Sequence, residues 1–303
     1  MSSGAIRTGP IRMHHHSEFP LERLAEAKGT TTVSVCLPAR NEESTVGHIV
    51  EVLRCDLLER GLIDELWVID DHSEDGTARV AADAGARVVA AADVLPRYGS
   101  GHGKGEVLWK SLLVTEGDIV LWCDADLRSF DHRFVSGLLG PLLCEEGIDF
   151  VKGFYERPES DGEGGGRVTE LVARPLIALL FPRLAGIEQP LSGEYGGRRS
   201  LLEQLPFVEG YGVEMGMLID LARRFGTGCM AQVDLEIRHH RNRTLGELSP
   251  QAAAITQTVL RRVDRDLLDT VATLRVGDRD VSIEAAERPP MIEVAEYLDR
   301  HRR

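Results

Sequence analysis

Two aspartates one residue apart, Asp124 and Asp126, follow directly on an apolar run at residues 119–123. An uninterrupted apolar run of this length predicts a buried strand, and the two carboxylates then lie where the strand ends. Open α/β sheets bind ligands at the carboxyl ends of their strands. Two acidic side chains so close together repel each other unless a cation lies beside them, and hard divalent cations prefer oxygen ligands. The pair therefore predicts a site for a divalent metal ion that bridges a nucleotide diphosphate.

Two other interpretations of this aspartate pair stay open at this point. Either side chain could simply cap a following helix. Alternatively, an apolar strand followed by two such aspartates is how phosphatases of the haloacid dehalogenase type begin, with the first aspartate as nucleophile. Those enzymes have threonine or valine two residues after the second aspartate, where this chain has Arg128. Their motif also usually opens the domain, whereas here a long stretch of chain precedes it.

The pattern around the aspartates predicts alternating strands and helices. Strands are expected at 31–37, 65–70, 87–92 and 118–123, and helices at 44–59, 76–83 and 106–114. This alternation predicts right-handed βαβ units and a parallel sheet. Beyond residue 126 we expect strands at 150–155 and 230–237 and helices at 133–144, 169–180, 213–225 and 250–273. The four early strands would bring their following loops to one edge of the sheet.

Three further polar segments follow the predicted strands. Pro38–Glu43 reads P-A-R-N-E-E, residues 70–77 read D-D-H-S-E-D-G-T, and residues 101–106 read G-H-G-K-G-E. Asn, Asp and Glu at such positions can meet a nucleobase and ribose, and Lys104 adds positive charge at a helix N-terminus, where anions bind. Each segment alone is equally typical of a helix cap, an ordinary turn or a flexible loop.

The composition limits the partners of the chain. It has 35 Lys and Arg against 49 Asp and Glu, a net charge of −14, which repels nucleic acid and anionic membranes. An anionic substrate therefore needs a local basic pocket. The five cysteines show no C-x-x-C spacing, so we expect reduced thiols. We find no membrane span or signal peptide and expect a cytoplasmic protein. Residues 14–16, three histidines, are interpreted as part of a mobile polar tail.

Taken together, the segments resemble a known family. The four early segments, in this order and spacing, resemble the GT-A glycosyltransferases over residues 31 to about 130. Further strings are G-G-G-R-V-T-E-L at 164–171, Q-P-L-S-G-E-Y at 189–195, G-Y-G-V-E at 210–214 and R-H-H-R-N-R at 238–243. With them the chain resembles the retaining glycosyltransferases glucosyl-3-phosphoglycerate synthase and bacterial mannosyl-3-phosphoglycerate synthase, over residues 30 to about 250.

The resemblance implies a fold and an organisation. The fold would be α/β of the GT-A type, a Rossmann-like and mostly parallel sheet flanked by helices. We expect an N-terminal tail at 1–28, a nucleotide-sugar-binding half at 29–130, an acceptor-binding half of the same domain at 131–275, and a C-terminal arm at 276–303. The cofactor would be Mg²⁺ or Mn²⁺, the partners a nucleotide-sugar donor and 3-phosphoglycerate, and the assembly a homodimer.

The resemblance also implies residue roles. The metal would lie on Asp126 and His240, a carboxylate and imidazole pair that suits Mg²⁺ or Mn²⁺. The residues implied in catalysis are Asp126, Glu214, Lys104 and Arg238. Those implied in binding the nucleotide sugar are Pro38, Ala39, Arg40, Asn41, Glu42, Asp71, Lys104, Asp124, Ala125 and Asp126. Those implied in binding the acceptor are Gly166, Arg167, Val168, Thr169 and Asn242.

Three departures from the glucosyl-enzyme pattern bear on the donor. Arg40 replaces an apolar residue, Asp71–His72 replace Ser-Gly, and Ala125 replaces a serine between the two aspartates. A carboxylate at position 71 could accept both adjacent donors of guanine, so we expect mannose or glucose from a GDP-sugar, transferred to the 2-hydroxyl of 3-phosphoglycerate. The alternative is a UDP-glucose-dependent glucosyl-3-phosphoglycerate synthase. More remote are the phosphatase with Asp124 as nucleophile and an inactive nucleotide-sugar sensor.

Overall fold

The computed structural model describes residues 6–99, 101–156, 166–238, 244–263, 272–276, 279–283 and 286–301. Up to residue 144 the elements are β1 (Arg12–His15), α1 (Leu21–Lys28), β2 (Val33–Ala39), α2 (Val46–Leu53), β3 (Glu65–Asp70), α3 (Thr77–Asp83), β4 (Arg87–Ala90), α4 (Lys104–Val114), β5 (Ile119–Trp122) and α5 (Arg133–Cys144). They continue with β6 (Phe150–Glu156), α6 (Arg174–Leu180), β7 (Tyr195–Arg198), α7 (Arg199–Leu202), β8 (Phe207–Val208), α8 (Val213–Arg224), β9 (Met230–Ile237), α9 (Leu245–Val263), β10 (Ala272–Val276), β11 (Arg279–Ile283), β12 (Glu287–Arg288) and α10 (Ala295–His301).

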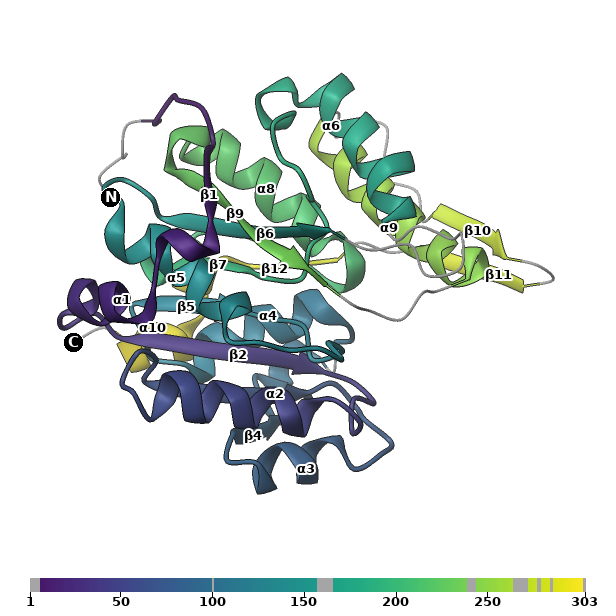
Figure 1. The fold of residues 1–303 in the computed structure, drawn as a ribbon. Coiled ribbons are helices and arrows are strands. Elements are labelled where there is room, and N and C mark those ends of the chain that lie inside the picture. Colours follow the sequence, from purple (N-terminus) through teal and green to yellow (C-terminus); the bar gives the residue numbers. More distant parts are fainter. Residues whose placement is uncertain are drawn as a thin grey trace.

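An eight-stranded sheet in the order β1-β9-β6-β7-β5-β2-β3-β4 forms the centre of the molecule (Figure 1). All its pairings are parallel except those of β7, which runs antiparallel to both β5 and β6. The start of β7 therefore lies at the same edge of the sheet as the carboxyl ends of β5 and β6. The predicted α/β fold with a mostly parallel sheet is confirmed.

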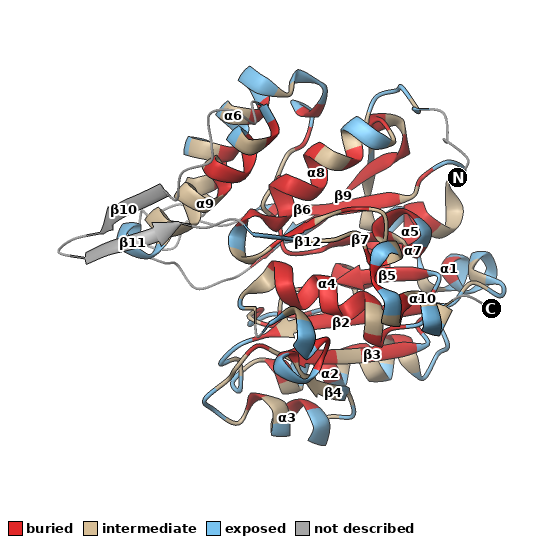
Figure 2. Ribbon diagram, turned by 180° about the vertical axis from the view of Figure 1, so that it is seen from behind, coloured by how far each residue is buried: buried red, intermediate tan, exposed pale blue. Residues whose placement is uncertain are grey.

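Helices cover both faces of the sheet, and the alternation of side chains along β5 explains why. Val120 and Trp122 pack in one apolar core with residues of α4 and α8. Leu121 packs in a second core with residues of α2 and α5. Because successive strand side chains point to opposite faces, an unbroken apolar strand is buried on both sides. Figure 2 shows the buried residues concentrated in these central strands.

The sequence missed two strands of this sheet. β1 lies in the segment interpreted as a mobile tail, yet residues Arg12–His15 pair in register with 231–234 of β9. That interpretation of the histidines was wrong, because the strand conformation comes from pairing with β9 and not from an apolar pattern. β7 has the sequence Y-G-G-R, in which no side-chain alternation is visible. It is held by partners on both sides.

The helix predicted at 250–273 begins earlier and, as described, runs over Leu245–Val263. Its start is set by Thr244, whose backbone N–H donates to Glu247 Oε2 at 2.7 Å while Glu247 N lies 3.4 Å from Thr244 Oγ1. This reciprocal pair is a capping box. The segment T-L-G-E was therefore the overlooked sequence signal.

The C-terminal arm folds back on its own chain. β12 pairs antiparallel with β8, and Met291, Val294 and Tyr297 are buried. Arg288 of the arm forms an ion pair of 2.7 Å with Glu106, a fully buried side chain in the first turn of α4. The arm therefore supports the helix that begins with Lys104. Among the described residues, none of the helices combines the length and apolar character that crossing a membrane requires.

Candidate active site at the carboxyl edge of the sheet

Five charged side chains from four parts of the chain meet at the carboxyl edge of the central strands. Asp124 and Asp126 follow β5, Arg238 follows β9, and Lys104 and Glu214 lie in the first turns of α4 and α8. We call these five residues the acid–base cluster. Because neighbouring strands are parallel, their carboxyl ends lie at the same edge of the sheet. Helices α4 and α8 begin at this edge as well. The sequence predicted every one of these five residues as a site residue.

Asp124 lies at the centre of the cluster and binds two cations through different oxygens. Its Oδ1 lies 2.6 Å from Lys104 Nζ, and its Oδ2 lies 3.1 Å from the Arg238 guanidinium. Lys104 also lies 3.1 Å from Glu214. A Cβ added at Gly193 would overlap the Asp124 carboxylate, so this position requires glycine. The carboxylate is thereby fixed between the two cations.

Arg238 connects the two aspartates to a buried layer beneath them. It donates to Asp126 Oδ1 at 2.8 Å, lies 3.4 Å from Glu194, and contacts the Tyr155 hydroxyl. The guanidinium side chain is only 5% exposed. A planar fork with several donors can serve three acceptors at once, which an ammonium group does less well. Arg238 is therefore the cation shared by both aspartates and Glu194.

The charge states of the cluster follow from burial opposed by neighbours. Burial raises the pKa of Asp124, but Lys104 and Arg238 outweigh this effect and hold it well below its usual range. Burial likewise lowers the pKa of Lys104, yet Asp124 and Glu214 raise it well above the usual value. The pKa of Arg238 is raised in the same way, mainly by Glu194. Lys104 and Arg238 thus stay cationic at neutral pH, as groups that bind phosphate must.

The sequence analysis did not identify a layer of buried charged residues behind the acid–base cluster. Glu194 is fully buried, and burial raises its pKa above the usual value. Lys152 donates to the Ser192 carbonyl at 2.9 Å and lies 4.2 Å from the centre of the Tyr195 ring. Glu194 stands in the string Q-P-L-S-G-E-Y, which carried the resemblance without an assigned role. Because β7 was not predicted, no local pattern indicated that Glu194 lies beside a buried strand.

The buried side chain of Lys152 should make the free energy of unfolding depend on pH. Burial lowers its pKa to about 7, whereas an unfolded lysine titrates near 10.4. Between these values the unfolded chain binds one proton more than the native chain, so Lys152 makes stability rise with pH. The slope approaches about 1.4 kcal/mol per pH unit. Lys152→Met removes this slope.

We therefore expect the wild type to gain about 2 kcal/mol of unfolding free energy relative to Lys152→Met between pH 8 and pH 9.5. Urea unfolding of both proteins at the two pH values measures this difference. Lys28→Met serves as a control, since the Lys28 side chain pairs with Asp64 near the surface. An equal pH response of wild type and Lys152→Met would contradict a neutral buried amine.

The loops after β2 and β3 lie next to the cluster and bind each other. Asn41 has φ +57°, a left-handed conformation that asparagine tolerates, and its Oδ1 accepts from Glu74 N at 2.8 Å. Asn41 N donates to Ser73 Oγ at 2.9 Å, and Glu42 N donates to Thr77 Oγ1 at 2.8 Å. The predicted base-binding residues therefore form one joined edge, with Pro38 and Ala39 as the last residues of β2 and Arg40 exposed beside them.

The hydrogen bonds of Asp71 weaken the argument that this carboxylate selects guanine. Asp71 is 5% exposed, and its Oδ2 accepts from the backbone N–H of Gly103 at 2.9 Å. Its Oδ1 lies 3.0 Å from His72 Nδ1. Gly103 has φ +90°, which requires glycine and turns its N–H toward the carboxylate. Each oxygen of Asp71 thus already has a partner within the protein and the side chain is buried, so the observed geometry does not single out guanine, and base binding by Asp71 stays a prediction.

The predicted acceptor residues lie on another segment. Gly166 has φ +86° and precedes a helical stretch in which Thr169 is buried and Arg167 and Val168 are half-buried. This stretch packs against α9. The predicted metal ligand His240 and the predicted acceptor residue Asn242 lie outside the described residues, as does the glycine run before Gly166. Their roles stay predictions.

Asp126 fits a divalent metal in its exposure and in its donor atoms. Its side chain is 37% exposed, against 23% for Asp124, 8% for Glu214 and none for Glu194. Mg²⁺ and Mn²⁺ prefer carboxylate oxygens and keep several waters, which an open position allows. Ala125 O accepts from Thr45 Oγ1 at 2.7 Å and anchors the segment between the two aspartates. Asp126 is therefore the carboxylate of the cluster best placed for a metal.

Comparison with known proteins places this geometry in a family. The model of Glycosyl transferase family 2 matches residues 34–207. The chain is 44% identical to a glucosyl-3-phosphoglycerate synthase of Petrotoga mobilis, with 95% of this chain and 96% of the relative covered. It is 48% identical to the glucosyl-3-phosphoglycerate synthase of Mycolicibacterium smegmatis, over 88% of this chain and 91% of the relative.

Two solved structures of enzymes of this kind also resemble the chain. A crystal structure of mannosyl-3-phosphoglycerate synthase from Rubrobacter xylanophilus has a TM-score of 0.86 at 41% identity, covering 93% of this chain and 97% of that one. The glucosyl-3-phosphoglycerate synthase of Mycobacterium tuberculosis, in complex with Mn²⁺, UDP-glucose and phosphoglyceric acid, has a TM-score of 0.86 at 44% identity, covering 94% and 99%. These relatives contradict the phosphatase alternative, and Asp124 is bound by two cations instead of being free as a nucleophile.

Proposed function

The chain belongs to glycosyl transferase family 2, and on this premise we propose that it is a retaining, metal-dependent glucosyl-3-phosphoglycerate synthase. It would transfer glucose from UDP-glucose to the 2-hydroxyl of 3-phosphoglycerate. The observation that carries the proposal is the pairing of Asp124 with both Lys104 and Arg238 at the carboxyl edge of the sheet. This places two permanent cations in an otherwise acidic protein, where a diphosphate would lie.

UDP-glucose replaces the GDP-sugar expected from the sequence. The argument for guanine depended on Asp71, whose oxygens bind Gly103 N–H and His72. The most similar relatives described above are named glucosyl-3-phosphoglycerate synthases, and a solved relative is a complex with UDP-glucose. Mannose transfer stays the second candidate, supported by the likeness to the mannosyl enzyme of Rubrobacter xylanophilus. The homodimer and the cytoplasmic location stay predictions from the sequence.

The chemistry assigned to the chain is electrostatic. As the bond between the sugar and the diphosphate breaks, negative charge grows on the departing phosphate oxygens. Lys104 and Arg238 would stabilise this charge from fixed positions, which is the largest effect that such sites supply. A divalent ion, held by Asp126 and by the predicted ligand His240, would add Lewis-acid stabilisation of the diphosphate when bound.

The remaining groups would orient the sugar and manage the proton. Glu214 is buried and paired with Lys104, so it would accept hydrogen bonds from sugar hydroxyls as a carboxylate. The new bond forms between the anomeric carbon and the 2-hydroxyl oxygen of the acceptor. Retention is assigned to attack from the face that the diphosphate leaves, with a donor phosphate oxygen taking the hydroxyl proton. No step requires a covalent sugar–enzyme bond.

A donor and acceptor panel tests the proposal. Purified protein with Mn²⁺ is given UDP-glucose, GDP-glucose or GDP-mannose, each with 3-phosphoglycerate or glycerate, and products are separated by chromatography. We expect the highest kcat/KM for UDP-glucose with 3-phosphoglycerate. A preference for GDP-mannose would replace the donor and keep the family. No transfer from any of the three donors would support the nucleotide-sugar sensor instead.

Arg167→Ala tests the acceptor assignment. If Arg167 binds the phosphate of 3-phosphoglycerate, a charge-assisted hydrogen bond of about 1.5–3 kcal/mol is lost, which corresponds to a rise of roughly 10- to 100-fold in the acceptor KM. The KM for UDP-glucose should stay within about twofold. Arg183→Ala, in a short helical turn at 182–184, is the matched control. An unchanged acceptor KM in Arg167→Ala would move the phosphate site elsewhere.

A further inference from the structure

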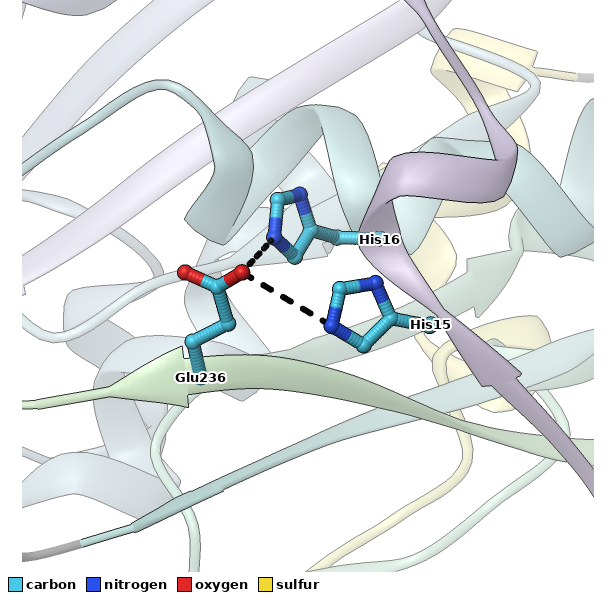
Figure 3. Close-up of side chains that lie close together, drawn as sticks. All are labelled: His15, His16 and Glu236. Atoms are coloured by element: carbon cyan, nitrogen blue, oxygen red, sulfur yellow. Dashed lines mark ion pairs between the residues drawn. The ribbon is translucent and has the colours of Figure 1, made fainter.

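A group of metal-ligating side chains outside the acid–base cluster joins β1 to β9. His15 ends β1, His16 follows it, and Glu236 stands near the end of β9 (Figure 3). Glu236 Oε1 lies 3.1 Å from His16 Nε2 and 3.7 Å from His15 Nε2. One ligand atom from each residue lies within 4.8 Å of the other two. The three side chains converge on one point.

The backbone explains why Glu236 faces the histidines. The register between β6 and β9 shifts where Phe154 pairs with Asp234 and Glu156 pairs with Ile237. This bulge puts Glu236 at φ +63°, a conformation uncommon for glutamate, while its N–H donates to Asp234 Oδ1 at 2.8 Å. Bulges re-aim side chains, and here the carboxylate is directed to the edge strand β1. His15 itself pairs in register with Asp234.

The distances suit a small tetrahedral ion. Zinc binds imidazole nitrogen at 2.0–2.1 Å and carboxylate oxygen at 2.0–2.2 Å, which places neighbouring ligand atoms about 3.3–3.5 Å apart. The distances from Glu236 Oε1 to the two histidine nitrogens, 3.1 and 3.7 Å, bracket this separation. Small side-chain rotations suffice to bring all three atoms to bonding distance of one ion.

The hydrogen bonding of the two histidines is compatible with a ligand role. His16 Nε2 is buried and has no hydrogen-bond partner of acceptable geometry among the described residues. His15 Nδ1 lies 2.7 Å from Ser17 Oγ and 3.3 Å from Ser17 N. Ser17 N–H donates to this nitrogen, so Nδ1 is an acceptor in this structure. Metal binding through Nε2 requires the other tautomer, in which Nδ1–H donates to Ser17 Oγ instead, as metal-bound histidines donate their second ring N–H.

We infer that His15, His16 and Glu236 form a second metal site, for a transition-metal ion of the zinc class with water as a further ligand. Two imidazoles select such ions over Mg²⁺, which prefers oxygen ligands. Side-chain exposures of 41%, 20% and 51% leave room for entry of the ion and for the water. The ion would tie the N-terminal strand to the end of β9, two residues before Arg238.

Zinc binding to the full-length protein tests the inference. The background is Asp126→Ala, which removes the carboxylate assigned to the catalytic metal. Calorimetric titration with Zn²⁺ should give one strong site that excess Mg²⁺ does not displace. Co²⁺ in place of Zn²⁺ should give visible absorption typical of nitrogen and oxygen ligands in tetrahedral geometry. In this background, Glu236→Gln and His16→Ala should each weaken Zn²⁺ binding by about 100-fold or more, as loss of a ligand exceeds the 10- to 100-fold effects of outer groups.

Two matched variants control for other histidines. His48→Ala removes an exposed histidine of α2, and His102→Ala removes one member of the cluster Asp71, His72 and His102. Both should bind Zn²⁺ as the Asp126→Ala background does, with melting midpoints recorded for all variants. Unchanged Zn²⁺ affinity in Glu236→Gln and His16→Ala overturns the inference. So does loss of the strong site in His102→Ala, or the absence of a strong site in the background protein.

Discussion

Replacing Asp126 with alanine is expected to lower kcat/KM for the proposed glucosyl transfer by more than about 100-fold, because the carboxylate that we propose as a ligand of the catalytic metal is lost. Asp126 is the most exposed of the four carboxylates that surround Arg238 and Lys104, so its loss should not disturb the core. Steady-state rates at several Mn²⁺ concentrations measure the effect, and the apparent affinity for Mn²⁺ should fall together with the rate.

Asp83→Ala is the matched control for this prediction. Asp83 ends α3 with a side chain that is 71% exposed, and it pairs only loosely with Arg79 at 3.4 Å. The same substitution there should leave both the rate and the Mn²⁺ dependence within about twofold. Near wild-type turnover by a folded Asp126→Ala protein would show that this carboxylate does not bind the metal.

Arg238→Met is expected to produce the largest loss of stability. The guanidinium is 5% exposed and serves Asp124, Asp126 and Glu194, so its removal leaves carboxylates at the buried edge with one cation fewer. Breaking a buried ion pair from one side costs about 3–5 kcal/mol. Urea unfolding at pH 7 should show a loss of this size, and transfer activity should fall in parallel.

The pH dependence separates this cause from a simple packing defect. Without Arg238 the carboxylates are more easily protonated, so the stability deficit of Arg238→Met should shrink as the pH falls from 7 to 5. The control Arg40→Met replaces an exposed arginine and should change stability by no more than about 0.5 kcal/mol. A deficit below 1 kcal/mol at pH 7, or one independent of pH, would contradict the shared-cation role of Arg238.

Much of the acid–base cluster was predictable because its residues follow strong local patterns. Asp124 and Asp126 come after an apolar run that predicts a buried strand, and β5 lies there. Lys104 opens a helix after a glycine-rich turn, and α4 begins at Lys104. Arg238 follows a strand whose predicted bounds match β9. In each case the local pattern and the resemblance point to the same edge of the sheet.

The parts that were missed depend on contacts distant in sequence. β7 contains two glycines in four residues and is a strand only because β5 and β6 lie on both sides. Glu194, just before it, therefore had no predicted place. The residue type of Asp71 suggested a base-binding carboxylate, but nothing local indicated that Gly103, 32 residues later, would donate to it.

The ion pair between Arg288 and Glu106 has a consequence for how the protein is made. The two residues are 182 positions apart, and Trp109 of the same helix donates to the Pro289 carbonyl at 2.9 Å. A chain leaving the ribosome exposes Glu106 and Lys104 long before Arg288 has been synthesised. Domains generally fold as units during synthesis, from the N-terminus onward. The first turn of α4, which carries Lys104, is therefore completed only after Arg288 has been synthesised, and a nascent chain stalled before Arg288 lacks this support.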